Sequence, residues 1–303
     1  MNRNIMLIIS LLAMNHIFSQ QIPDTIYNPE IPAKMYPKNS GTMIHIDQGH
    51  RNFHTKNNRF LPFAKLLSKD GYRVASFEGE FKKDKLKNLK ILVISNALSE
   101  NSRPPFVAPT ESAFSTNEIH NVKEWVKNGG SLFLIADHMP FAGASANLAK
   151  AFGFKFYDSF VMDPDVRGIF DFSRKNKMLS HNMITNGRTA KEQVNHIRTF
   201  TGQGFETPKE AISILNLKKE YTVFITDTMW VFNEKTPKIS AENLSQGAVL
   251  EYGKGRIAVF GEAAMFTAQI AGRERIKVGM NSVEAGENYQ LLLNLIHWLD
   301  RAY

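Results

Sequence analysis

Two runs of consecutive apolar residues constrain the fold of this 303-residue chain more than any other feature. Residues 90–95 read KILVIS, and residues 131–137 read SLFLIAD. Strands that are apolar on both faces are typical of parallel sheets covered by helices on both sides. Between the two runs, Ser115-Thr-Asn-Glu118 forms a capping box that predicts a helix ending at Gly129-Gly130. This strand, helix, strand order predicts right-handed crossovers and a parallel sheet.

The same patterns extend along most of the chain. Further strands are predicted at 42–47, 72–77 and 256–260, antiparallel strands at 221–226 and 248–252, and helices at 59–70, 144–152 and 285–299. From about 155 to 245 the regular alternation of strands and helices is lost, and we interpret this segment as a β-rich insertion. The predicted fold class is α/β: one domain over 42–303, flavodoxin-like and three-layered, with a mostly parallel central sheet and helices on both faces.

The amino-terminal segment has the layout of an export signal. Arg3 precedes an apolar run from Ile5 to Met14, which is shorter than the roughly 20 residues that span a bilayer. We therefore expect residues 1–20 to be a signal peptide cleaved near Ser19 or Gln20, residues 21–41 to be an extended lead-in, and no transmembrane anchor to remain after cleavage. The expected location is periplasmic or secreted. The alternative for this segment is a buried first helix.

Composition excludes some chemistries. The chain has no cysteine, so disulfides, thiol nucleophiles and thiolate metal sites are ruled out. Its net charge is +8, and part of the excess is a lysine run between Lys82 and Lys90. Such a run can attract an acidic polymer, but no aromatic residues interleave it as single-stranded nucleic-acid binding requires. We expect a solvated face and no nucleic-acid partner.

Polar residues follow the carboxyl ends of four predicted strands. In an open parallel sheet, ligands bind in the crevice outside those ends, so these residues are expected to meet at one edge. The predicted catalytic residues are His50, His54, Asp137, His138 and Glu262. The predicted substrate-binding residues are Asp47, which would also orient an imidazole, Asn52, Asn96 and Gln203.

Each residue also has a purely structural interpretation. The histidines can be loop residues bonded to the backbone, Asp137 can cap the following helix, and Glu262 can stabilise the amino end of the segment that begins at Ala263. If the segment between His50 and His54 is helical, the two rings are one turn apart and could share a ligand. The coincidence of such residues at four strand ends is the reason to predict a site.

Two or three imidazoles with carboxylates and no thiol match the ligands of a hydrolytic metal site. We therefore consider a divalent metal, zinc or manganese, held by His50, His54 and His138, although the spacing matches no established metal motif. The metal-free alternative uses His50 or His138 as general base, oriented by a carboxylate. Residues 143–147 (GASAN) are a weakened GxSxG motif inside a predicted helix, so a serine nucleophile is disfavoured.

Several of these segments together carry a family resemblance. Residues 46–54 (IDQGHRNFH), 130–141 (GSLFLIADHMPF), 199–203 (TFTGQ) and 253–262 (GKGRIAVFGE) resemble an uncharacterised exported bacterial family of the class I glutamine amidotransferase-like (ThuA-like) superfamily. The resemblance covers most of 42–302 and implies the fold. It departs at two places: Asp137-His138 stands where the amidotransferases have their cysteine, and Gln48 replaces a glutamate of the resembled group.

The sequence thus predicts an exported hydrolase-like protein acting on a small polar substrate. A saccharide-derived substrate is implied by the resemblance and by export. The alternative is a non-catalytic module that binds a glycan or a protein partner with the same edge of the sheet.

Overall fold

The computed structural model describes residues 21–163 and 168–302. Within these ranges, nine strands form a central sheet. They are β2 (Met43–Asp47), β3 (Arg73–Phe77), β4 (Ile91–Ser95), β5 (Ser131–Ile135), β6 (Lys155–Phe156), β10 (Phe205–Glu206), β11 (Ile212–Asn216), β14 (Ser245–Tyr252) and β15 (Gly255–Phe260). Their order is β3-β2-β4-β5-β15-β14-β10-β6, and β11 also pairs with β14. The predicted signal peptide, residues 1–20, lies outside the described residues.

The half of the sheet that begins at β3 is parallel. Strands β3, β2, β4, β5 and β15 are joined by parallel ladders, whereas β14 runs antiparallel to β15. If the five parallel strands are numbered 1 to 5 by their order in the chain, their order across the sheet is 2-1-3-4-5. This is one of the common orders of doubly wound sheets. The order reverses between β2 and β4. The carboxyl ends of these two strands therefore flank the position where such sheets bind ligands.

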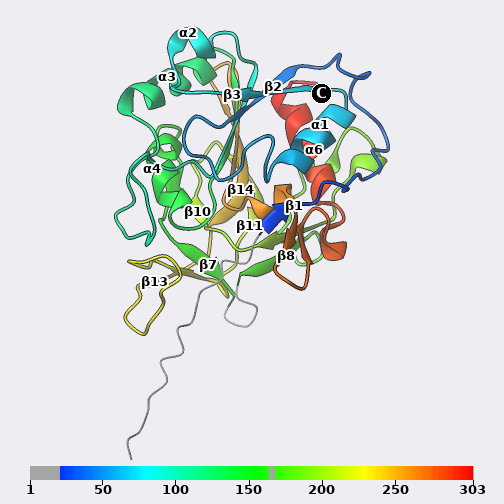
Figure 1. Cartoon of the computed structure of the whole chain (residues 1–303). Helices are drawn as coiled ribbons and strands as arrows, with labels where there is room; N and C mark the ends of the chain where they lie inside the picture. The colour runs from blue at the N-terminus through cyan, green and yellow to red at the C-terminus, as the bar shows by residue number, and fades with distance from the viewer. Residues whose placement is uncertain (1–20, 164–167, 303) are drawn as a thin grey trace, which may run out of the picture.

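Helices cover both faces of the sheet (Figure 1). One face packs against α1 (Leu61–Lys69) and α6 (Asn288–Leu299), and the other against α2 (Lys83–Leu86), α3 (Thr116–Lys127) and α4 (Phe141–Lys150). Successive side chains of a buried strand point into the two hydrophobic cores in turn. In β4, Ile91 and Val93 face α1 and α6, while Leu92 and Ile94 face α3. The three layers expected from the apolar runs are present.

Helix α3 begins where the capping box predicts. The Ser115 hydroxyl accepts a hydrogen bond from the Glu118 amide, and the Glu118 carboxylate accepts one from the Ser115 amide at 3.0 Å. Helix α4 begins at Phe141, three residues before the predicted start, and Pro140 is its N-cap residue.

Smaller antiparallel sheets surround the central one. They are built from β7 (Phe160–Met162), β12 (Thr222–Phe224) and β13 (Lys238–Ser240), from β8 (Ile169–Ser173) and β9 (His196–Phe200), and from β1 (Gln21–Pro23), β16 (Ala268–Ala271) and β17 (Ile276–Gly279). The first two groups and the short α5 (Met183–Asn186) belong to the predicted insertion. The lead-in is more ordered than expected, because β1 pairs with β16.

Short 3-10 turns complete the fold at η1 (Ala190–Glu192), η2 (Ala264–Phe266) and η3 (Val283–Ala285). Among the described residues, no helix has the length and apolarity needed to cross a membrane.

Candidate functional site

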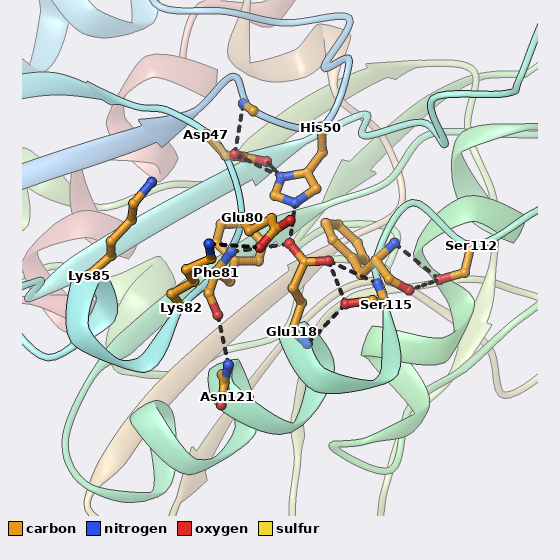
Figure 2. Close-up of polar contacts among 12 residues, drawn as sticks. Asp47, His50, Glu80, Phe81, Lys82, Lys85, Ser112, Ser115, Glu118 and Asn121 are labelled. Carbon is orange, nitrogen blue, oxygen red and sulfur yellow. Dashed lines mark hydrogen bonds and ion pairs between the residues drawn. The ribbon is translucent and has the colours of Figure 1, made fainter.

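The loop after β2 holds a buried histidine between two carboxylates. His50 Nδ1 lies 3.0 Å from Asp47 Oδ2, and His50 Nε2 lies 2.9 Å from Glu118 Oε1 (Figure 2). The ring packs against Phe81 and Phe114, with centroid distances of 4.3 and 5.0 Å. Both ring nitrogens of His50 are thus engaged inside the protein.

The two carboxylates favour the charged imidazole. Burial lowers the pKa of His50, but the hydrogen bonds and charges of Asp47 and Glu118 outweigh burial and raise it above its ordinary value. Burial likewise raises the pKa of Glu118, and hydrogen bonds from His50, Ser115 and Phe81 overcome that effect and lower it to about 2. The arrangement is a buried ion pair that ties the β2 loop to the first turn of α3.

Asn52 completes this group, which we call the His50 cluster (Asp47, His50, Asn52 and Glu118). Its amide Nδ2 donates to Asp47 Oδ2 at 3.0 Å and to the Ser95 carbonyl at 3.2 Å, and its Oδ1 accepts from the His50 amide. The predicted substrate-binding groups of Asp47 and Asn52 are therefore used to hold the loop.

His54 does not share a ligand with His50, and the helical arrangement considered for the two rings is wrong. Arg51 has a φ of 43°, so the backbone turns between them. His54 stacks on Phe60 at 4.9 Å and contacts Ser95 Oγ through Nδ1 at 3.1 Å. Burial lowers the pKa of His54 to about 3, so it is a neutral core residue at neutral pH.

A second polar group lies at the carboxyl ends of β4, β5 and β15. We call it the Asp137 cluster (Asn96, Asp137, His138, Gln203 and Glu262). Asn96, with a φ of 46°, accepts the Asp137 amide on its side-chain oxygen at 2.9 Å, and its carbonyl accepts the Phe53 amide at 2.9 Å. Asn96 therefore joins the β4 and β5 ends to the loop that carries the His50 cluster.

The Asp137 cluster contains two buried carboxyl groups that interact electrostatically. Burial raises the pKa of Asp137, and burial together with the charge of Asp137 raises the pKa of Glu262 well above its ordinary value. Glu262 also accepts the amides of Ala264 and Met265 at 2.7 and 2.8 Å. Its structural interpretation is correct, because it caps the 3-10 turn η2.

His138 is the partly exposed imidazole of the cluster. Its Nδ1 lies 2.7 Å from the Met139 carbonyl, and because a carbonyl only accepts, Nδ1 carries the proton. Its Nε2 is 4.0 Å from Asp137 Oδ1. The ring stacks on Phe160 at 4.4 Å and meets Trp230 edge-on at 4.8 Å.

Trp230 extends this aromatic contact to the surface. It has a φ of 63° and is 48% exposed, and its ring packs on Phe160 at 4.5 Å. The segment is fixed because the Met229 amide donates to the Phe106 carbonyl at 3.0 Å. The insertion thus contributes an exposed aromatic surface beside His138, which sequence patterns did not indicate.

Gln203 closes the cluster from the insertion side. Its Nε2 donates to the Ala136 carbonyl at 2.9 Å, while its Oε1 is buried without a hydrogen-bond partner. Gln203 is fully buried, so this oxygen has no partner but is also closed off from solvent, while Asn96 Oδ1 already accepts the Asp137 amide.

The predicted metal site formed by His50, His54 and His138 is not present as such. Over 21–163 and 168–302, no three histidine or carboxylate side chains are arranged to hold a metal ion. The physical reason is that the three rings point to different partners, namely two carboxylates, the Ser95 hydroxyl and the Met139 carbonyl.

Sequence reasoning also missed Glu118 as a partner of His50. The capping box indicated Glu118 as part of a helix start, but the same carboxylate reaches back to the β2 loop with its other oxygen. The capping box and the histidine after β2 were both visible in the sequence, but nothing in the sequence links them, because Glu118 lies 68 residues from His50.

No protein-family model matches the chain, and no curated protein matches it in sequence. Solved structures similar to it include the mmIFT52 N-terminal domain, with a TM-score of 0.57 at 15% identity, covering 85% of this chain and 97% of that one. They also include a ThuA-like protein of Bacteroides uniformis, with a TM-score of 0.46 at 12% identity, covering 90% of this chain and 94% of that one. A GMP synthase-like protein of Thermoplasma acidophilum has a TM-score of 0.43 at 12% identity, and the match covers 86% of this chain and 95% of that one. At these identities the mmIFT52 likeness shows a shared fold.

Proposed function

We propose that this protein is a hydrolase that acts on a small polar substrate of saccharide origin, with His138 as its general base. The observation that carries the proposal is the state of the His138 ring. Its Nδ1 proton is committed to the Met139 carbonyl, so in the neutral ring the lone pair is on Nε2, at a partly exposed position. His50 and His54 are less suited, because one is held by two carboxylates and the other is buried and neutral.

Asp137 supplies the complementary group. Its raised pKa favours the protonated acid, and its Oδ1 is 4.0 Å from His138 Nε2. In the proposed reaction, Nε2 removes a proton from water as the water attacks, and Asp137 gives a proton to the leaving group. Gln203 holds the end of β5 in place by donating its Nε2 to the Ala136 carbonyl. The role of Glu262 is structural: it holds the turn η2 through the Ala264 and Met265 amides.

The proposal includes the finer assignments made from sequence. We assign the sheet to the flavodoxin-like fold because of its 2-1-3-4-5 strand order. The family is proposed to be the exported group of the glutamine amidotransferase-like superfamily, on the four resembling segments. Without a cysteine, thiol-dependent amidotransfer is excluded, and a periplasmic or secreted location remains part of the proposal.

The test is hydrolysis of a panel of p-nitrophenyl esters and p-nitrophenyl glycosides. We expect turnover by the wild type, loss of at least about 100-fold in His138→Ala, and no change in His120→Ala, which alters an exposed histidine on α3. Absence of turnover across the panel, or equal rates in wild type and His138→Ala, would overturn the catalytic proposal.

A second candidate is a non-catalytic glycan-binding module, which is favoured by the exposed Trp230 beside His138. A half-exposed indole offers a flat apolar face. In this case Trp230→Ala abolishes oligosaccharide binding measured by calorimetry, while His138→Ala preserves it. Loss of binding in both variants, together with turnover in the panel, would favour the hydrolase.

A further inference from the structure

The lysine run between α2 and β4 is divided by the fold into two sets. Lys82 Nζ lies 3.3 Å from the Glu80 carboxylate, and Lys85 Nζ donates to the Glu78 carbonyl at 3.0 Å. The other three, Lys83, Lys87 and Lys90, line a cavity of about 480 Å³. All five lysines are exposed, in agreement with the solvated face expected from sequence, and three of them also line this cavity.

This cavity lies between α2 and α3, which are neighbours at the top of the molecule in Figure 1. Its lining includes Lys90 and Gly130, which immediately precede β4 and β5. It is therefore at the amino ends of the parallel strands, whereas the Asp137 cluster is at their carboxyl ends. A ligand here would be independent of the proposed hydrolase.

The deeper wall of the cavity is apolar. Leu86, Leu89 and Trp125 line it and are buried. The indole is locked in place, because its Nε1 donates to the Leu89 carbonyl at 3.3 Å and a side chain at Gly130 would overlap its ring. The wall is therefore preformed and needs no rearrangement to accept an apolar group.

The rim of the cavity is cationic. The residues that line the cavity include three lysines and His120 but one acidic residue, Glu124. Within the part of the chain that the structure describes, no acidic side chain forms an ion pair with Lys83, Lys87 or Lys90. Unpaired cations around an apolar wall raise the local concentration of anions and favour a ligand that also has an apolar body.

We propose that this cavity binds a small organic anion, with a carboxylate or phosphate between the lysines and a flat apolar body against Leu86, Leu89 and Trp125. The volume is within the range of ligand pockets, which is roughly 300–1,000 Å³. The Lys83 and Lys87 ammonium groups provide the charge recognition. The fixed indole provides the contact that inorganic anions cannot make.

Isothermal titration with 1-naphthyl phosphate tests the proposal, with 1-naphthol and inorganic phosphate as the uncharged and the purely ionic probes. The test variant is Lys83→Gln/Lys87→Gln, and the matched control is Lys82→Gln/Lys85→Gln, which removes the same charge from the same run but from outside the cavity. Thermal melting of both variants checks that they are folded.

We expect 1-naphthyl phosphate to bind at least about tenfold more tightly than either simpler probe. The test variant should bind it about tenfold more weakly, since each lost ammonium group removes a charge contact, and the control should bind within about twofold of wild type. Equal weakening in the two variants would overturn the proposal by showing general attraction to a basic surface. Equal affinity for 1-naphthol, or no binding by the wild type, would overturn it as well.

Discussion

Replacement of Glu118 by glutamine is the sharpest test of the His50 cluster. The carboxylate accepts hydrogen bonds from His50 Nε2 at 2.9 Å, from the Phe81 amide at 3.1 Å, and from the amide and hydroxyl of Ser115 at 3.0 and 2.8 Å. Glutamine has one accepting oxygen, so its amide nitrogen must face donors at one of these positions. It also removes a buried negative charge from beside His50.

The lost hydrogen bonds and the lost charge determine how far Glu118→Gln lowers the free energy of unfolding. Hydrogen bonds to charged groups contribute about 1.5–3 kcal/mol each, and breaking a buried ion pair costs roughly 3–5 kcal/mol. Because one oxygen remains, we expect Glu118→Gln to lower the free energy of unfolding by about 3 kcal/mol, which corresponds to a Tm lower by about 6 °C for a domain of this size. The matched control is Glu124→Gln on the same helix, with an expected change below about 0.5 kcal/mol.

The pH dependence distinguishes this ion pair from a simple packing defect. The pKa of Glu118 is lowered in the folded protein, so its contribution is present above its ordinary pKa and is lost as the pH falls toward about 2. The pKa of His50 is raised, so its contribution is complete below its ordinary pKa and is lost as the pH rises through the folded value. The difference between wild type and Glu118→Gln should therefore be largest between about pH 5 and 6.5.

Urea unfolding followed by circular dichroism at a series of pH values from about 4 to about 9 measures this difference. A destabilisation that is constant across the series would refute the charged pair and leave only lost packing. A difference below about 0.5 kcal/mol at about pH 6, no larger than that of Glu124→Gln, would refute the whole argument.

Four further outcomes are expected. Phe133→Ala, in the core between two other phenylalanines, should cost about 3–5 kcal/mol in urea unfolding. Asp137→Asn should relieve repulsion with Glu262, stabilising the protein by about 1 kcal/mol at about pH 8 and by less at about pH 5, where both carboxyls are more protonated; equal effects at both pH values would contradict this. His54→Phe should change stability by less than about 1.5 kcal/mol at about pH 8 and should become more stabilising by about 2 kcal/mol at about pH 5, because below its ordinary pKa the unfolded histidine takes up a proton that the folded one does not. Mass spectrometry of the exported protein should find a mature amino terminus near Gln20, and an intact Met1 would refute the signal peptide.

The layered core was predictable because burial on both faces leaves a direct trace in sequence. The apolar runs at 90–95 and 131–137 correspond to β4 and β5, and the capping box gave the start of α3 to the residue. These features depend on neighbours close in the chain. They required no knowledge of distant contacts.

The candidate site was predictable only in outline. Parallel strands bring the predicted residues to the carboxyl edge, but not into a single group, because side-chain direction depends on backbone turns. The positive φ of Arg51 sends His50 and His54 to different partners, and arginine gives no sign of such a conformation. The pairing of His50 with Glu118, 68 residues away, and the placement of Trp230 depend on tertiary structure alone.

The reversal of direction at β14 has a consequence for how this protein can vary. Because β14 is antiparallel to β15, the polypeptide from β6 to β14 leaves and re-enters along one border of the sheet. The hairpin that bears Trp230 can therefore be lengthened, shortened or exchanged without threading new chain through the parallel strands. Ligand choice could diversify in this lobe while the scaffold beneath stays unchanged, and chimeras grafted between β12 and β13 are a practical route to altered recognition.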